Sequence, residues 1–236
     1  MTLYAYCVRR AGDPAPEAGL RGVDGGEVFA GERDGLGVWL SAVEAPPAPD
    51  RERVEAHDRV VRAALRTATP LPLRFGAVFV DEAAALDALA GRAEGLLAGL
   101  ERVAGRVEMS VAALWDAAAE RESLLAERPE LRPAEGRPAG GRAYLEGKRR
   151  QRALEEALRA RAEAVLDRVA RRLAPAAGPA EEARSVLPRP DVAGTVAHLV
   201  RREESLAYRE AAMAAGRGLP GVELRVSGPW APYSFA

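Results

Sequence analysis

One long apolar stripe does most to limit the folds open to this sequence. Between Arg142 and Pro175, apolar residues recur every three or four positions over about five turns, as they do along one side of an α-helix. The members of the stripe are Leu154, Leu158, Ala162, Val165, Val169 and Leu173. The remaining positions are largely charged, so this side of the helix must be buried against a second layer. We expect Pro175 to end the helix.

Short strand patterns in the same part of the chain supply that layer. We expect strands over 107–115, 192–200 and 222–226, and a further helix over about 203–215. This alternation of strands with helices favours an antiparallel or mixed sheet that carries its helices on one face.

The first part of the sequence predicts another sheet. Residues 2–8 are apolar on both faces, which is typical of a buried strand. Strands over 27–33 and 36–43 flank Asp34-Gly35, a dipeptide that favours a hairpin turn. One more strand is predicted by strict alternation of the apolar residues Leu71, Leu73, Phe75, Ala77 and Phe79.

Two helices are expected beside this sheet. Asp50 is placed to cap the first helix, and Asp81 is placed to cap the second, which we expect to run without interruption to Gly105. The apolar stripe of the first consists of Val54, His57, Val61 and Leu65. The stripe of the second consists of Leu86, Leu89, Ala93, Leu96, Leu100 and Val103.

The helix end at Gly105 is the expected domain boundary. With 236 residues the chain exceeds the usual size of a single domain. We therefore predict an α+β fold with two domains, 1–105 and 106–227, each a small sheet with packed helices. Residues 228–236, with the sequence GPWAPYSFA, are expected to form an extended, docked C-terminal tail.

The composition argues against several classes of function. Charged residues make up 29% of the chain but the formal net charge is −1, which argues against binding to nucleic acid or to a membrane surface. Cys7 is the only cysteine, so no intrachain disulfide is possible. The sequence has no signal-peptide pattern and no run of about 18 apolar residues. We expect a soluble, cytoplasmic protein.

Candidate catalytic and metal-binding residues are few. His57 and His198 lie within apolar patterns, which favours hydrogen-bonded core histidines, and we expect Cys7 to be a small buried hydrophobic residue. No His and Cys residues have the spacing of a zinc site, and no glycine pattern matches a nucleotide-binding loop. The sequence predicts no catalytic residue, no cofactor and no metal. The basic segment 148–152 is best explained as a solvated face or as a contact with a partner helix.

Three segments together resemble one protein family. They are AHDRVVRAALRTATPLPLRFGAVF at 56–79, GRAYLEGKRRQ at 141–151 and LRVSGPWAPYSF at 224–235. In this order and at these separations they are similar to the gas vesicle protein family GvpF/GvpL, and the N-terminal LYAYCV also fits. Ala77 departs from the family pattern, in which Thr is common at this position.

The resemblance implies a fold, a role and partners. Proteins of this family have two α+β domains, of which the C-terminal one is ferredoxin-like. The implied role is non-enzymatic, in assembly of the gas vesicle shell. The implied partners are the major gas vesicle shell protein and other gas vesicle accessory proteins, and the implied location is the gas vesicle in the cytoplasm.

The tail contains most of the candidate contact residues. Pro229 and Pro232 restrict its backbone, and Trp230, Tyr233 and Phe235 are able to bury large areas in a groove. The groove belongs either to this chain or to a partner. We favour this chain, because a permanently exposed tail of this composition would aggregate. Arg74, on the opposite face of its strand from Phe75, is a further candidate for a protein contact.

Two alternative functions stay open at this point. The first is a ferredoxin-like small-molecule-binding enzyme or sensor with a cleft between its domains, for which Arg74, His57 and Tyr144 are the polar candidates. The second is an interaction adaptor unrelated to gas vesicles.

Overall fold

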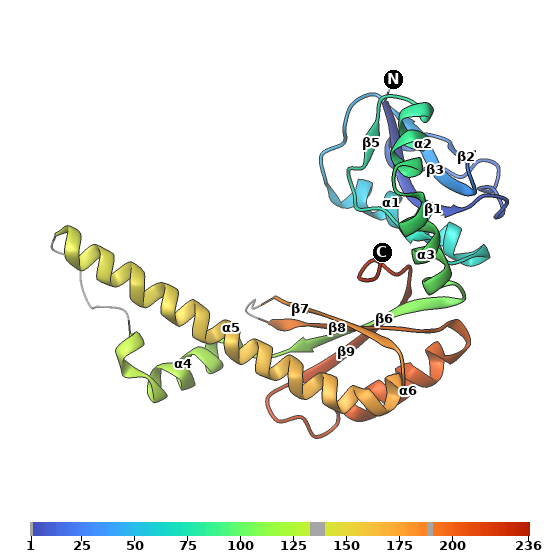
Figure 1. The fold of residues 1–236 in the computed structure, drawn as a ribbon. Coiled ribbons are helices and arrows are strands. Elements are labelled where there is room, and N and C mark those ends of the chain that lie inside the picture. Colours follow the sequence, from blue (N-terminus) through green and yellow to red (C-terminus); the bar gives the residue numbers. More distant parts are fainter. Residues whose placement is uncertain (1, 133–139, 188–190) are drawn as a thin grey trace. The chain divides into compact units, whose positions relative to one another are not determined.

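The computed structural model describes residues 2–132, 140–187 and 191–236. The contacts divide the chain into two units. Unit 1 comprises residues 1–109, 199–205 and 228–236, and unit 2 comprises residues 110–198 and 206–227. Both units combine helices with a sheet (Figure 1), so the predicted α+β class is confirmed.

Unit 1 is built on an antiparallel sheet in the order β2-β3-β1-β4, with β5 also paired to β1. Its strands are β1 (Thr2–Arg10), β2 (Val28–Arg33), β3 (Leu36–Val43), β4 (Leu71–Pro72) and β5 (Val78–Phe79). Its helices are α1 (Arg51–Thr67), α2 (Glu82–Ala90) and α3 (Ala93–Val103), with short 3-10 turns at Val23–Gly25 and Arg202–Glu204.

The local signals for the first three strands and for both helix starts are confirmed. β1 is buried on both faces from Tyr4 to Val8. The hairpin turn between β2 and β3 has positive φ angles of 52° at Asp34 and 82° at Gly35, as a two-residue hairpin loop requires. Asp50 and Asp81 accept hydrogen bonds from the N–H groups three residues later, at 2.8 Å in each case.

Three expectations for unit 1 are wrong in detail. The strand expected over 71–79 is two short strands, because Gly76 has a φ of +94° and bends the chain between them. The helix expected to continue to Gly105 is broken between α2 and α3, where Gly91 ends the first helix. Val54 of the predicted α1 stripe is 44% exposed.

Unit 2 contains a sheet in the order β7-β8-β6-β9. Its strands are β6 (Arg106–Leu114), β7 (Glu181–Val186), β8 (Val192–Arg201) and β9 (Glu223–Trp230), whose ends at 106–109, 199–201 and 228–230 belong to unit 1. Its helices are α4 (Ala117–Glu127), α5 (Gly141–Ala177) and α6 (Ser205–Gly216), with a 3-10 turn at Pro129–Leu131. The order of elements is β6-α4-α5-β7-β8-α6-β9, and Figure 1 shows α5 and α6 on one side of this sheet.

The long apolar stripe packs as expected. Leu154, Ala162, Val165, Val169 and Leu173 are buried, and Leu158 is half-buried. Pro175 does not end α5, which continues to Ala177, so its missing N–H removes one bond within the last turn. β7 was not predicted, and β9 extends past 226 to Trp230.

No described helix has the length and the apolar character that a membrane-spanning segment needs.

Candidate functional site

Residues 228–236 run close against the first part of β6. At Gly228 the φ angle is +116°, and an added Cβ would lie 2.7 Å from the backbone oxygen of Glu108. Only glycine combines that backbone angle with such a close approach. Gly228 therefore permits the close approach of the last part of β9 to β6.

A buried carboxylate holds the far part of the tail. The backbone N–H of Ser234 donates to Glu108 Oε2 at 2.8 Å, and the Ser234 hydroxyl donates to Glu108 Oε1 at 3.0 Å. Glu108 is only 7% exposed, and this burial raises the pKa of its carboxyl group, while both bonds from Ser234 oppose the rise.

Phe235 is the apolar anchor of the tail. It is 7% exposed, and its backbone oxygen accepts a hydrogen bond from Arg102 of α3. A groove of about 580 Å³ adjoins it, and Leu71 and Leu96 line this groove together with Phe235. The tail is thus fixed by an apolar side chain and by polar bonds on both sides of it.

Trp230 lies against α1. The guanidinium carbon of Arg62 is 4.3 Å from the centre of the Trp230 ring, which is a cation–π contact. Arg62 is itself held by Asp58 at 2.6 Å, one turn earlier on the same helix. Trp230 is therefore in contact with a cation that is itself ion-paired on α1.

Tyr233 is the tail aromatic with the most exposed surface, at 40%. Its ring centre lies 6.4 Å from that of His57. Burial of its inner part and the nearby charge of Asp58 raise the pKa of the Tyr233 hydroxyl, which stays protonated at neutral pH.

His57 is the centre of an aromatic cluster that also contains Tyr4, Tyr6 and Phe75. Tyr4 Oη accepts the Gly76 N–H at 3.1 Å and lies 2.9 Å from His57 Nδ1. Tyr4 Oη and His57 Nδ1 thus share a hydrogen bond inside the core. Within the described part of the chain Nε2 has no hydrogen bond of normal geometry, and burial lowers the pKa of His57. The predicted hydrogen-bonded core histidine is confirmed.

Arg74 lies in the turn between β4 and β5 and is exposed. It forms no ion pair with any carboxylate in the part of the chain that the structure describes. Its neighbour Phe75 packs on His57 with ring centres 6.0 Å apart. Tyr233 thus packs beside the His57 cluster, and Arg74 is the exposed chain neighbour of Phe75, a member of that cluster, whereas Trp230 and Phe235 have separate contacts.

The other candidate residues have structural explanations. His198 Nδ1 lies 2.8 Å from Tyr208 Oη and its Nε2 lies 3.2 Å from Glu182, so it is a hydrogen-bonded core residue as predicted. Cys7 is buried, which raises the pKa of its thiol to about 12. Tyr144 belongs to α5 of unit 2 and is exposed. Among the described residues, no group of three or more His, Cys, Asp or Glu side chains could hold a metal ion.

Sequence reasoning missed Glu108, Arg102 and Arg62, the residues that hold the tail. Glu108 carried a signal, because it is the only charged residue in the apolar strand pattern 107–115. The two arginines lie on helix surfaces that have both acidic and basic residues, and their sequence positions gave no such signal. The four predicted contact residues remain candidates, now with defined surroundings.

The raised pKa of Glu108 gives a test of its position. Folding favours its protonated form, so the stability it contributes below pH 4.5 is lost as the pH rises through its pKa in the folded state. We expect Glu108→Gln to gain stability relative to wild type between pH 4.5 and 7.5. Urea unfolding across this range measures the difference in stability between the variant and the wild type. Both proteins contain the same histidines, so the contribution of the histidines to the pH dependence cancels in this difference. Parallel stability curves would show that Glu108 is not buried in solution.

Comparison with known proteins finds relatives that match almost the whole length of the chain. The family model for gas vesicle synthesis protein GvpL/GvpF matches residues 2–236. Gas vesicle protein L of a Streptomyces species is 31% identical, over 99% of this chain and 92% of that protein. Gas vesicle protein L1 of Halobacterium salinarum is 30% identical, over 99% of this chain and 89% of that protein.

Solved structures support the fold. GvpF from an Anabaena species has a TM-score of 0.74 at 24% identity, over 100% of this chain and 95% of that chain. GvpF from Microcystis aeruginosa has a TM-score of 0.72 at 22% identity, over 99% and 98%. With a family match along the whole chain and 31% identity to a full-length relative, the chain belongs to the GvpL/GvpF family of gas vesicle proteins.

Proposed function

We propose that this chain takes part in gas vesicle assembly as a non-enzymatic component that binds the major shell protein through the surface formed by Tyr233 and Arg74. Its membership of a gas vesicle synthesis family supports the assembly role. The observation that supports this surface is the firm anchoring of an aromatic side chain that stays 40% exposed.

The physical argument rests on the fixed position of Tyr233. Its neighbours on either side are held, since Pro232 is buried and Ser234 is bonded to Glu108. Little conformational entropy is therefore lost when the exposed edge of Tyr233 meets a partner. A tyrosine ring offers an apolar face together with a hydroxyl, which suits an apolar client that still carries polar groups.

Co-expression with the major shell protein, followed by pull-down and a solubility assay of that subunit, tests the proposal. We expect the two proteins to co-purify, and the combined substitution Tyr233→Ala and Arg74→Ala to reduce recovery of the shell protein by at least about fivefold. Val80→Ala is the matched control, because this unit 1 residue is 75% exposed and outside the proposed surface. Failure of the wild-type protein to co-purify, or equal recovery with the double variant, would contradict the proposal.

A further inference from the structure

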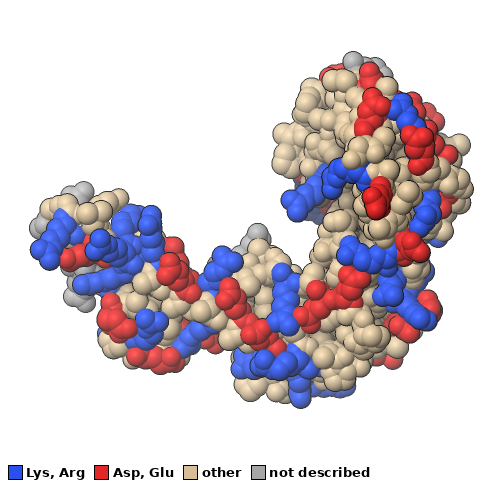
Figure 2. Space-filling view, in the orientation of Figure 1, with Lys and Arg blue, Asp and Glu red and all other residues tan. Residues whose placement is uncertain are grey.

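The first turns of α5 carry a concentration of positive charge. From Arg142 to Arg152 the chain has five basic side chains and one acidic side chain, a net charge of +4, whereas the whole chain has −1. Figure 2 shows the blue side chains gathered at the N-terminal end of this helix. We call residues 142–152 the basic arm.

The cations of the basic arm are largely unpaired. Further along the helix, Arg159 pairs with Glu163 at 3.2 Å and Arg161 pairs with Glu120 at 2.9 Å. By contrast, four exposed cations of the arm make no ion pair with a described carboxylate. They are Lys148, Arg149, Arg150 and Arg152. Their charge is therefore available to a partner.

Among the described residues, no apolar core lies beneath the basic arm. The apolar cluster that joins α4 to α5 consists of Leu124, Leu131 and Leu154, with partly buried neighbours from Ala153 onward on α5. Before that point Tyr144 and Leu145 are 54% and 58% exposed. Large apolar side chains next to unpaired cations are typical of a contact surface rather than of a purely solvated face.

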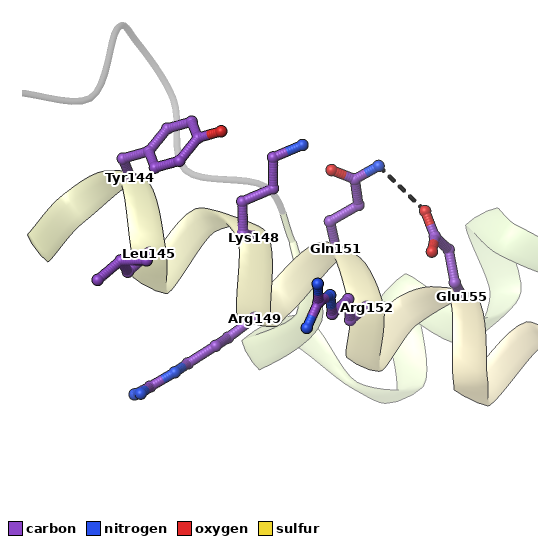
Figure 3. Close-up of a pocket in the computed structure, with 7 residues that line it drawn as sticks. All are labelled: Tyr144, Leu145, Lys148, Arg149, Gln151, Arg152 and Glu155. Carbon is purple, nitrogen blue, oxygen red and sulfur yellow. Dashed lines mark hydrogen bonds between the residues drawn. The ribbon is translucent and has the colours of Figure 1, made fainter. Parts of the chain in front are cut away.

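The side chains line a shallow groove of about 500 Å³ along the helix. Figure 3 shows Tyr144, Lys148 and Gln151 along one side of α5, with Leu145 and Arg149 on another. The Lys148 ammonium lies 6.0 Å from the centre of the Tyr144 ring. The groove thus presents aromatic and aliphatic surface with cations spaced one helical turn apart.

We propose that the basic arm binds an acidic amphipathic helix of a partner protein. The apolar side chains of that helix would cover Tyr144 and Leu145, and its carboxylates would pair with Lys148, Arg149 and Arg152. Charge complementarity supports an acidic occupant, and the aliphatic Leu145 suits a protein helix better than a nucleic acid. The inference goes beyond the proposed function, because it uses neither the tail nor Arg74.

The sequence offers a direct probe, since Lys148 is its only lysine. We suggest the full chain and a synthetic amphipathic peptide helix with leucines on one side and glutamates on the other. A water-soluble carbodiimide should couple a peptide glutamate to Lys148 as an amide, and mass spectrometry locates the crosslink. Coupling that is no greater than with a peptide of the same composition in scrambled order would overturn the proposal.

Charge reversal separates the arm from the rest of the helix. We expect Lys148→Glu with Arg152→Glu to weaken peptide binding, measured by fluorescence anisotropy, at least tenfold. Arg168→Glu with Arg171→Glu makes the same charge change at exposed positions of α5 outside the arm, and should alter binding less than twofold. Equal losses in both variants would show a non-specific charge effect, and tighter binding of a single-stranded oligonucleotide would identify nucleic acid as the ligand. Either result would overturn the proposal.

Discussion

Replacing Phe235 with alanine should lower the free energy of unfolding by about 3 kcal/mol, the lower end of the range for a buried phenylalanine. Phe235 is 7% exposed and borders an existing groove of about 580 Å³, so the substitution would remove most of a buried ring and enlarge that groove. Urea unfolding followed by circular dichroism measures the loss. The effect should be larger than that of Ser234→Ala, which removes one hydrogen bond to Glu108 and should cost about 1 kcal/mol.

The control for this prediction is Val80→Ala, which shortens a side chain that is already 75% exposed. It should change stability by less than about 0.5 kcal/mol. If Phe235→Ala were equally mild, the tail would not be docked on its own chain in solution. In that case Glu108 would lose the cover of the tail, and the pH dependence expected for Glu108→Gln, which comes from the burial of Glu108, would disappear.

The sequence predicted those parts of the fold whose causes are local. β2, β3 and the turn between them follow from alternation on either side of Asp34-Gly35, and the starts of α1 and α2 follow from their aspartate caps. These signals lie within a few residues of the structure that they specify. Local consistency of this kind is why they were reliable.

Errors arose where a correct pattern was interrupted by backbone geometry. The alternation over 71–79 is real, since Leu71 is buried and Arg74 is exposed, but a strand also needs backbone donors and an extended chain. Pro72 supplies no donor and Gly76 turns the chain. β7 was missed for the opposite reason, because its sequence EEARSV is mostly polar and it pairs at an edge of the sheet.

In the candidate site, the sequence predicted the contact residues of the tail but not the residues that they contact. The aromatic residues and prolines of the tail predicted that it makes contacts, but its partner Glu108 is 126 positions from Ser234. Nothing in a single sequence pairs residues so far apart, and the choice of Arg62 as the side chain over Trp230 depends on where α1 packs. Large aromatic side chains that make contacts are therefore easier to predict from the sequence than the residues that hold them in place.

Replacing Gly22 with alanine should also cost about 3 kcal/mol, for a different physical reason. The φ angle of Gly22 is −103°, which other residues adopt, so the backbone is not the cause. An added Cβ would lie 1.9 Å from Tyr6 Oη and 2.6 Å from Tyr6 Cζ. Tyr6 would have to move, and its bonds with Ser41 at 2.7 Å and with the Val23 N–H at 2.8 Å would break inside the core.

A double-mutant cycle identifies this cause. Tyr6→Leu removes both clashing atoms and destabilises the protein by itself, but Gly22→Ala added to it should cost less than about 1 kcal/mol, a coupling of about 2 kcal/mol. Gly95→Ala is the matched control, because its Cβ would meet nothing within 4 Å on the helix α3 and should stabilise slightly. Additive losses for Gly22→Ala and Tyr6→Leu would mean that the two residues do not meet. The close packing of Gly22 on Tyr6 would then be wrong. Because Tyr6 lies against His57, and His57 lies beside Tyr233, the surroundings described for Tyr233 would be wrong as well.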